Sequence, residues 1–185
     1  MRKNTIITVL ILIVATAFFR VVLGFAPQIA VAVFSGAFFA QKGNKKLAFI
    51  LPLVSMLVSD MLFQALYVLN LSTIEGFYGI DQLVNYAMIA GLAFIGFYAK
   101  EFKFTNILSA NIAAPLVFFL ASNFFVWATN GGWHHTMNFS GLVACYVDGI
   151  PFLWKSVAST VVFGLIFFGA TYYFNRLELA KVYSK

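Results

Sequence analysis

Charged side chains are scarce in this sequence of 185 residues, because Asp, Glu, Lys and Arg together make up only 10% of it. A soluble domain usually carries about 25% charged residues, so this chain has too few of them to cover a surface that faces water. Hydrophobic residues make up 62%, and 23 of them are Phe. The composition excludes a soluble globule and predicts one integral membrane domain over residues 1–185, in contact with the lipid bilayer.

Several functional signatures are also missing. The only cysteine is Cys145, which excludes an internal disulfide. Acidic residues are few and the formal net charge is +6, but the positive residues lie in short segments between apolar runs, so membrane orientation explains them and no nucleic-acid binding is predicted. The sequence lacks a nucleophile elbow, a phosphate-binding glycine loop and an HExxH motif. We therefore expect a protein that is not an enzyme and that needs no cofactor.

Six apolar runs predict an all-α, polytopic membrane protein with six transmembrane helices. A helix of about 20 residues rises about 30 Å and crosses the hydrocarbon core. The second run is shorter and is expected to span or nearly span. The piece at 139–149 is too short to cross, so we expect a re-entrant or interfacial segment there, before a last helix that begins near Pro151. The predicted helices cover approximately 5–24, 27–40, 47–69, 82–99, 105–128 and 151–174.

The distribution of Lys and Arg predicts the orientation. The first run imitates a signal peptide, but no convincing cleavage motif follows it, so it is expected to remain as the first helix. With six crossings, every Lys and Arg except Arg20 and Lys155 falls on one side. Positive residues favour the cytoplasmic side of a membrane, so both termini are predicted to be cytoplasmic.

Two intramembrane charges are predicted to pair. Arg20 and Asp60 project to the same depth in the outer half of the bundle. A lone ionised residue near the bilayer centre costs on the order of 3 kcal/mol, so such groups usually pair or face water and suggest a functional site. A structural ion pair that only fixes helix packing is the alternative. Asp148 and Lys155 are expected in the same region, closer to the interface, where Lys155 can extend its charge into water.

Polar and aromatic residues predict a pocket that opens to the outside. Asn123 and Trp127 are four residues apart and share a helix face, as do Asp60 and Gln64. Together with Tyr146 and Asp148 from the segment before the last helix, they are predicted to bind a small molecule. An interfacial aromatic belt explains the tryptophans equally simply.

A metal site is not predicted. His134, His135 and Cys145 are of types that bind transition metals. Adjacent histidines seldom bind one ion on a regular element, however, and no further ligand completes a tetrahedral set nearby.

Two linked motifs carry a resemblance to a known family. They read N-F-x-x-W and G-L-x-x-C-Y-x-x-G-x-P-F, and they begin at Asn123 and Gly141. With these motifs the chain resembles an uncharacterised family of bacterial multi-pass membrane proteins (DUF6580-like), which is in turn similar to the S components of energy-coupling-factor vitamin transporters. The resemblance implies transport across the bacterial inner (plasma) membrane. It implies a vitamin-like ligand captured from outside, with a transmembrane partner subunit and an ATPase module supplied by other chains.

The resemblance also gives a meaning to a stripe of small residues. Ala32, Gly36 and Ala40 are spaced four apart, which lets another helix approach closely. In S components a similar stripe docks on the transmembrane partner, whereas packing inside the bundle is the simpler alternative. The competing function is an accessory or structural subunit of a membrane protein complex.

The predicted orientation is testable by cysteine labelling in intact cells. In a Cys145→Ser background, Gly43→Cys should resist a membrane-impermeant maleimide, because it lies in a positive and therefore cytoplasmic loop. Thr73→Cys, in a loop without Lys or Arg, should react. The reverse labelling pattern would overturn the orientation.

Overall fold

The computed structural model describes residues 3–23, 27–129 and 135–183, with side chains described at 11–22, 27–129 and 135–174. Within these ranges every regular element is a helix, as the composition predicts. The helices are α1 (Lys3–Leu23), α2 (Gln28–Gln41), α3 (Lys45–Val68), α4 (Ile80–Gly91), α5 (Ala93–Tyr98), α6 (Phe104–Ala128) and α7 (Phe139–Tyr183). Leu92 alone separates α4 from α5, so these two helices form nearly one continuous helix.

Four helical segments are long and apolar enough to cross a membrane. They are Lys45–Val68, Ile80–Tyr98, Phe104–Ala128 and Phe139–Phe174. Large apolar side chains such as Phe94, Leu120 and Ile166 lie exposed on the outside, which suits a lipid environment. These four are the spans found among the described residues, which for the side chains of α1 cover only 11–22. The 14 residues of α2 rise only about 21 Å. A membrane protein with several crossings is thus supported, and the number six stays a prediction.

The short helix α2 lies at the centre of the bundle. Its residues from Gln28 to Phe39 are buried, and it packs against every other helix. The cause is compositional, because α2 is apolar around its whole circumference and exposes no polar face that would hold it at a surface. Its aromatic side chains extend the core outward, since the Phe34 ring lies 5.8 Å from that of Phe167 and 5.2 Å from that of Phe168. The remaining helices are arranged around α2.

The small-residue stripe packs within the chain. A Cβ atom on Gly36 would overlap the carbonyl oxygen of Ala93, and one on Gly96 would overlap that of Val33, so α2 and α5 meet backbone to backbone. Ala32 is fully buried and Ala40 half-buried. At Ala32 and Gly36 the structure shows packing against helices of the same chain, and docking of a partner subunit on the stripe stays a prediction that nothing here supports.

The predicted re-entrant segment before the last helix is instead the beginning of that helix. α7 runs without a break for 45 residues with Pro151 inside it. A proline lacks the N–H that would bond the preceding turn, but apolar helices in membranes tolerate this loss, as α3 and α6 also do at Pro52 and Pro115. Asn138 caps the new start, because its Oδ1 accepts a hydrogen bond from the N–H of Gly141 at 2.9 Å.

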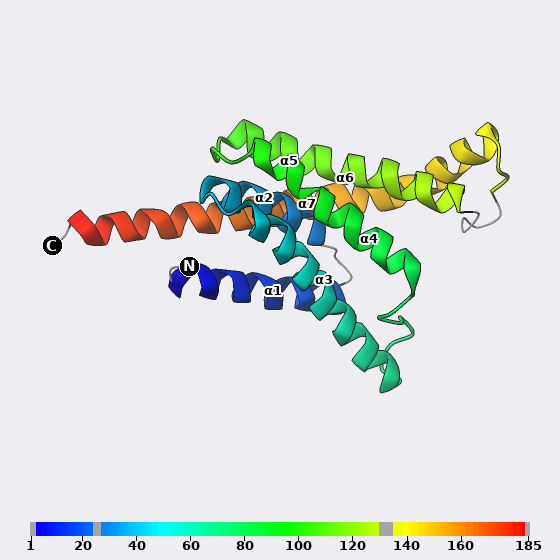
Figure 1. Ribbon diagram of the computed structural model, residues 1–185, viewed down its shortest axis with the longest axis horizontal. Helices are drawn as coiled ribbons and strands as arrows, with labels where there is room; N and C mark the ends of the chain where they lie inside the picture. Colours follow the sequence, from blue (N-terminus) through cyan, green and yellow to red (C-terminus); the bar gives the residue numbers. More distant parts are fainter. Residues whose placement is uncertain (1–2, 24–26, 130–134, 184–185) are drawn as a thin grey trace.

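The helix ends divide into one compact end and two separate arms. Figure 1 shows that α1 starts and α2 and α5 finish at one end of the bundle, here called the compact end, and that the last part of α7 projects alone beyond it. At the other end, the α3–α4 connection and the α6–α7 connection point away from each other. We call these projections the α3–α4 arm and the α6–α7 arm. The basic segments at Lys42–Lys46 and Lys100–Lys103 both lie at the compact end.

The close contact of α2 with α5 predicts a strong dependence on Gly36. Gly36→Ala should lower the free energy of unfolding by about 1 to 3 kcal/mol, because the added Cβ meets backbone that cannot move aside. Gly169→Ala is the matched control, since nothing lies within 4 Å of a Cβ at that helical position. It should raise stability by about 0.5 to 1 kcal/mol. Thermal unfolding of both variants in detergent checks the pair, and equal melting temperatures would contradict the observed packing.

Candidate functional site

Asp60 lies at the centre of a buried hydrogen-bond network on the α3–α4 arm. The carboxylate is 1% exposed, and its Oδ1 accepts the guanidinium of Arg20 from α1 in an ion pair. Its Oδ2 accepts the hydroxyl of Tyr86 at 2.6 Å and the Nε2 of Gln82 at 2.8 Å, both from α4. Arg20 also donates to the hydroxyl of Ser59. The network joins α1, α3 and α4.

Both carboxylate oxygens of Asp60 accept hydrogen bonds from side chains of the same chain. Buried polar networks of this kind rigidify a fold when all members are satisfied. Gln64, one turn further along α3, has a similar role because its Oε1 accepts the backbone N–H groups of Gly76 and Phe77 at 3.1 and 3.2 Å. Both residues thus hold the α3–α4 arm together, and their contacts match the structural alternative considered for the ion pair.

Three of the predicted pocket residues fix the far end of the α6–α7 arm. Trp127 donates from Nε1 to the carbonyl of Thr136 at 3.1 Å, and the Tyr146 hydroxyl donates to the carbonyl of Leu120 at 2.9 Å. Asp148 lies 3.3 Å from Nε2 of His135, but its side chain is 72% exposed. An ion pair so open to solvent contributes little to stability.

The structure does not bring the six predicted pocket residues together. Asp60 and Gln64 belong to the α3–α4 arm, whereas Asn123, Trp127, Tyr146 and Asp148 belong to the α6–α7 arm. α3 packs on α1, α2 and α4, while α7 packs on α6 and α2. The expectation of a single pocket failed because the predicted re-entrant segment, which was to cover α3, is part of α7. Lys155, expected near Arg20, lies exposed on α7.

A groove between α6 and α7 holds Asn123, one of the predicted residues. Its volume is about 210 Å³. Asn123 donates from Nδ2 to the carbonyl of Phe119 at 2.8 Å, and its Oδ1 receives only the weak donor Cys145 Sγ at 4.0 Å. Gly149 admits the Asn123 side chain, because a Cβ there would lie 2.6 Å from Oδ1. The groove is lined by Pro115, Phe118, Phe119, Ser122, Asn123, Gly149, Phe152, Leu153 and Ser156.

The groove lies on the inward face of the arm. Phe118 packs against the hydrophobic core, and Ser156 is one turn from Thr160, which is fully buried. Sequence reasoning found Asn123 but missed Ser122 and Ser156. The available signal was that each of these serines lies on a helix within a turn of another polar residue, as Ser122 does of Asn123 and Ser156 of Thr160.

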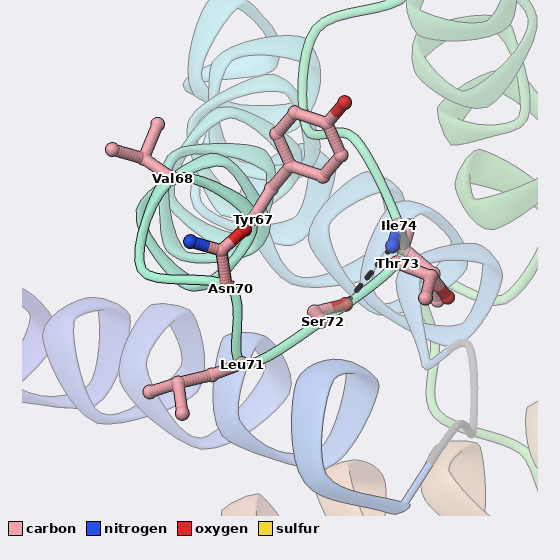
Figure 2. Close-up of a pocket in the computed structure, with 7 residues that line it drawn as sticks. All are labelled: Tyr67, Val68, Asn70, Leu71, Ser72, Thr73 and Ile74. Carbon is pink, nitrogen blue, oxygen red and sulfur yellow. Dashed lines mark hydrogen bonds between the residues drawn. The ribbon is translucent and has the colours of Figure 1, made fainter.

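A larger hollow of about 870 Å³ lies at the tip of the α3–α4 arm. Figure 2 shows that the side chains of Tyr67, Val68 and Leu71 point away from one another, so no polar groups converge on a ligand. Among its lining residues, the N–H of Ile74 donates to the hydroxyl of Ser72 at 3.0 Å, and the N–H of Asn70 donates to the carbonyl of Tyr67 at 3.0 Å. This hollow is an open loop surface and is a poor binding site.

The residues of metal-ligand type do not gather either. Among the described residues, no three His, Cys, Asp or Glu side chains lie close enough to hold an ion. His135 pairs with Asp148, and Cys145 Sγ contacts the carbonyl of Asn123 at 3.5 Å. His134 lies outside the described residues.

Comparison with known proteins identifies the family. Residues 1–181 match DUF6580, a family of unknown function. The chain belongs to DUF6580. No curated protein matches, and no solved structure matches. The DUF6580 assignment covers the Asp60 network and the groove alike, but it carries no functional description. The similarity to S components stays an implication of the sequence motifs.

The Asp60 network predicts energetic coupling between α1 and α3. Arg20→Met and Asp60→Leu should each cost about 3 to 5 kcal/mol, because each leaves a buried partner uncompensated. The double variant should be more stable than the sum of the two costs predicts, by more than about 1 kcal/mol. Arg20→Met combined with Gln64→Leu is the control and should be additive within about 0.5 kcal/mol, since Gln64 bonds the loop backbone instead. Additive effects in both cycles would show that the pair is not coupled.

Proposed function

We propose that this protein binds a small molecule from outside the cell and takes part in its transport across the bacterial inner membrane. It is proposed to be a binding protein and not an enzyme. The observation that supports this proposal is the groove between α6 and α7. It combines aromatic side chains with a few polar groups, as small-molecule sites usually do. Asn123 Oδ1 provides an acceptor there that the protein itself uses only weakly.

The arrangement of positive residues supports the proposed orientation. The basic connections gather at the compact end (Figure 1), and such clusters favour the cytoplasmic face. With six crossings both termini are cytoplasmic. The groove occupies the half of α6 that is farther from this end, since α6 begins at Phe104 and the groove starts at Pro115. It is therefore proposed to be filled from outside.

The size of the groove limits the ligand. Sites for drug-sized molecules measure about 300 to 1,000 Å³, and this groove measures about 210 Å³. A molecule with one ring, or one ring of a larger vitamin-like molecule, fits that space between Phe118, Phe119 and Phe152. An energy source and a transmembrane partner are proposed to come from other chains, through a surface other than the enclosed helix α2.

The proposal predicts that Asn123→Leu loses a bound molecule without unfolding the protein. The substitution removes a polar contact and leaves the apolar lining in place. Mass spectrometry of small molecules extracted from the purified protein should find at least one mass in wild type that is absent from Asn123→Leu.

Asn106→Leu is the matched control on the same helix. Asn106 bonds the carbonyl of Tyr98 at 3.4 Å, away from the groove, so this variant should retain the mass. Retention of the same molecules by both Asn123→Leu and Phe118→Ala would contradict ligand binding in the groove and favour an accessory subunit.

A further inference from the structure

Most of the positive side chains that the structure describes lie on two connections at the compact end (Figure 1). All of them are exposed, and one acidic residue, Glu101, accompanies them there. They are Lys42, Lys45 and Lys46 beside the turn between α2 and α3, and Lys100 and Lys103 beside the turn between α5 and α6. This end therefore carries an excess of positive charge.

The positive charge is not balanced within the described part of the chain. Lys103 pairs with Glu101 at 2.8 Å, whereas Lys45, Lys46 and Lys100 make no ion pair with a described residue. Lys45 and Lys46 also occupy the first turn of α3, which holds no acidic residue. A helix N-terminus favours negative charge, so two cations in this turn are not explained by the stability of α3.

Phe97 brings Lys45 and Lys100 to the same part of the surface. The Nζ of Lys45 lies 5.8 Å from the centre of the Phe97 ring. The backbone N–H of Lys100 donates to the carbonyl of Phe97 at 3.4 Å. The start of α3 and the end of α5 therefore meet at Phe97, with one exposed lysine on each side of the contact.

Aromatic rings continue from these lysines along the contact between α3 and α5. Phe49 lies one turn after Lys45 on α3 and shares its helix face. The Phe49 ring is 4.9 Å from that of Phe94 and 5.9 Å from that of Phe97, and the Phe94 side chain is 63% exposed. We call Lys45, Phe49, Phe94, Phe97 and Lys100 the basic seam.

We propose that the basic seam binds a phospholipid of net negative charge, with its headgroup at Lys45 and Lys100 and an acyl chain along Phe94. An anionic headgroup supplies the counter-charge that the described chain lacks, and each lysine near such a headgroup strengthens binding about fivefold. The enrichment of positive residues on one side of a membrane explains why the lysines lie at this end. It does not explain why two of them flank an aromatic seam, which a lipid with a charged head and an apolar chain matches.

A soluble anion fits the basic seam less well than a lipid. Free phosphate would contact the lysines and leave the Phe94 ring uncovered, whereas a phospholipid covers both. The proposal is independent of the groove between α6 and α7, because the basic seam belongs to α3 and α5. It holds even if the groove binds nothing.

The test compares two lipids that have the same acyl chains and different headgroups. Native mass spectrometry of the full-length protein in detergent measures the lipid bound per chain as dioleoylphosphatidylglycerol or dioleoylphosphatidylcholine is titrated. Wild type should bind the phosphatidylglycerol at least about fivefold more tightly, because only this lipid has a net negative charge. Equal affinities for the two lipids would overturn the proposal.

Single lysine variants locate the binding. Lys45→Gln and Lys100→Gln should each weaken the binding of phosphatidylglycerol about fivefold, because each removes one positive charge from the basic seam. Both substitutions are at exposed positions and should leave the melting temperature without added lipid unchanged. Lys155→Gln is the matched control, since Lys155 is an exposed lysine on α7 outside the two connections, and it should bind like wild type. An equal loss in Lys155→Gln, or no loss in the seam variants, would refute the assignment to the basic seam.

Inorganic phosphate separates a lipid site from a site for a soluble anion. At equal ionic strength, phosphate and chloride should give the same melting temperature, because phosphate has no chain to lie along Phe94. Phosphatidylglycerol should raise the melting temperature above that found with phosphatidylcholine, since it binds the folded state more tightly. A rise with inorganic phosphate as large as that with phosphatidylglycerol would assign the lysines to a soluble anion and overturn the lipid.

Discussion

The enclosure of α2 by every other helix is the constraint on which the rest of the structure depends. In a bilayer the lipid is as apolar as a leucine side chain, so helices associate through close packing and hydrogen bonds instead of hydrophobic burial. α2 provides the packing surface with small residues, and its backbone meets that of α5 at Gly36 and Gly96. A helix too short to cross easily is thereby kept in the interior, where its residues from Gln28 to Phe39 are covered by protein.

The two polar regions around this core are built in opposite ways. On the α3–α4 arm, the carboxylate of Asp60 accepts hydrogen bonds from donors on α1 and α4. One turn away, α1 and α3 are joined again by a hydrogen bond between the hydroxyls of Thr16 and Ser55, which lie 2.7 Å apart. In the groove on the α6–α7 arm, by contrast, Asn123 Oδ1 receives only the weak donor Cys145 Sγ at 4.0 Å. A saturated network fixes geometry, whereas an unsatisfied one lowers stability unless something binds to it. That contrast supports the α6–α7 side as the place of the proposed binding function.

The order and type of the helices could be predicted from the sequence because long apolar runs and basic connections give strong local signals. The pairing of Arg20 with Asp60 was also predictable, since charges at equal depth in a membrane have few other partners. The start of α7 was not, because Pro151 resembles a first helical turn and the cap at Asn138 lies in a polar loop of ordinary appearance. That single error moved Tyr146 and Asp148 to the wrong arm.

The lack of partners for some buried polar groups was not predictable for a different reason. Gln28 and Thr160 are separated by more than 130 positions in the sequence, and a lone Gln or Thr at a helix position carries no sign of whether its side chain is bonded. Only the packed structure shows that the amide of Gln28 and the hydroxyl of Thr160 have no partner among the described residues. By contrast, Asn123 was identified because its neighbour Trp127 lies on the same helix, within reach of local pattern reasoning.

A layer of aromatic side chains between the groove and the compact end limits how the proposed transport could proceed. Phe34, Phe167 and Phe168 are almost fully buried there, and the Phe168 ring also packs on Phe102 at 5.1 Å, near the compact end. In the proposed function, a molecule held in the groove meets these rings before it reaches the proposed cytoplasmic side. Close-packed aromatic layers do not deform continuously, so passage requires α7 to separate from α2 as a unit. In the proposed function, binding from outside and release to the inside are therefore distinct conformations, and the energy that interconverts them acts on the contact between α2 and α7.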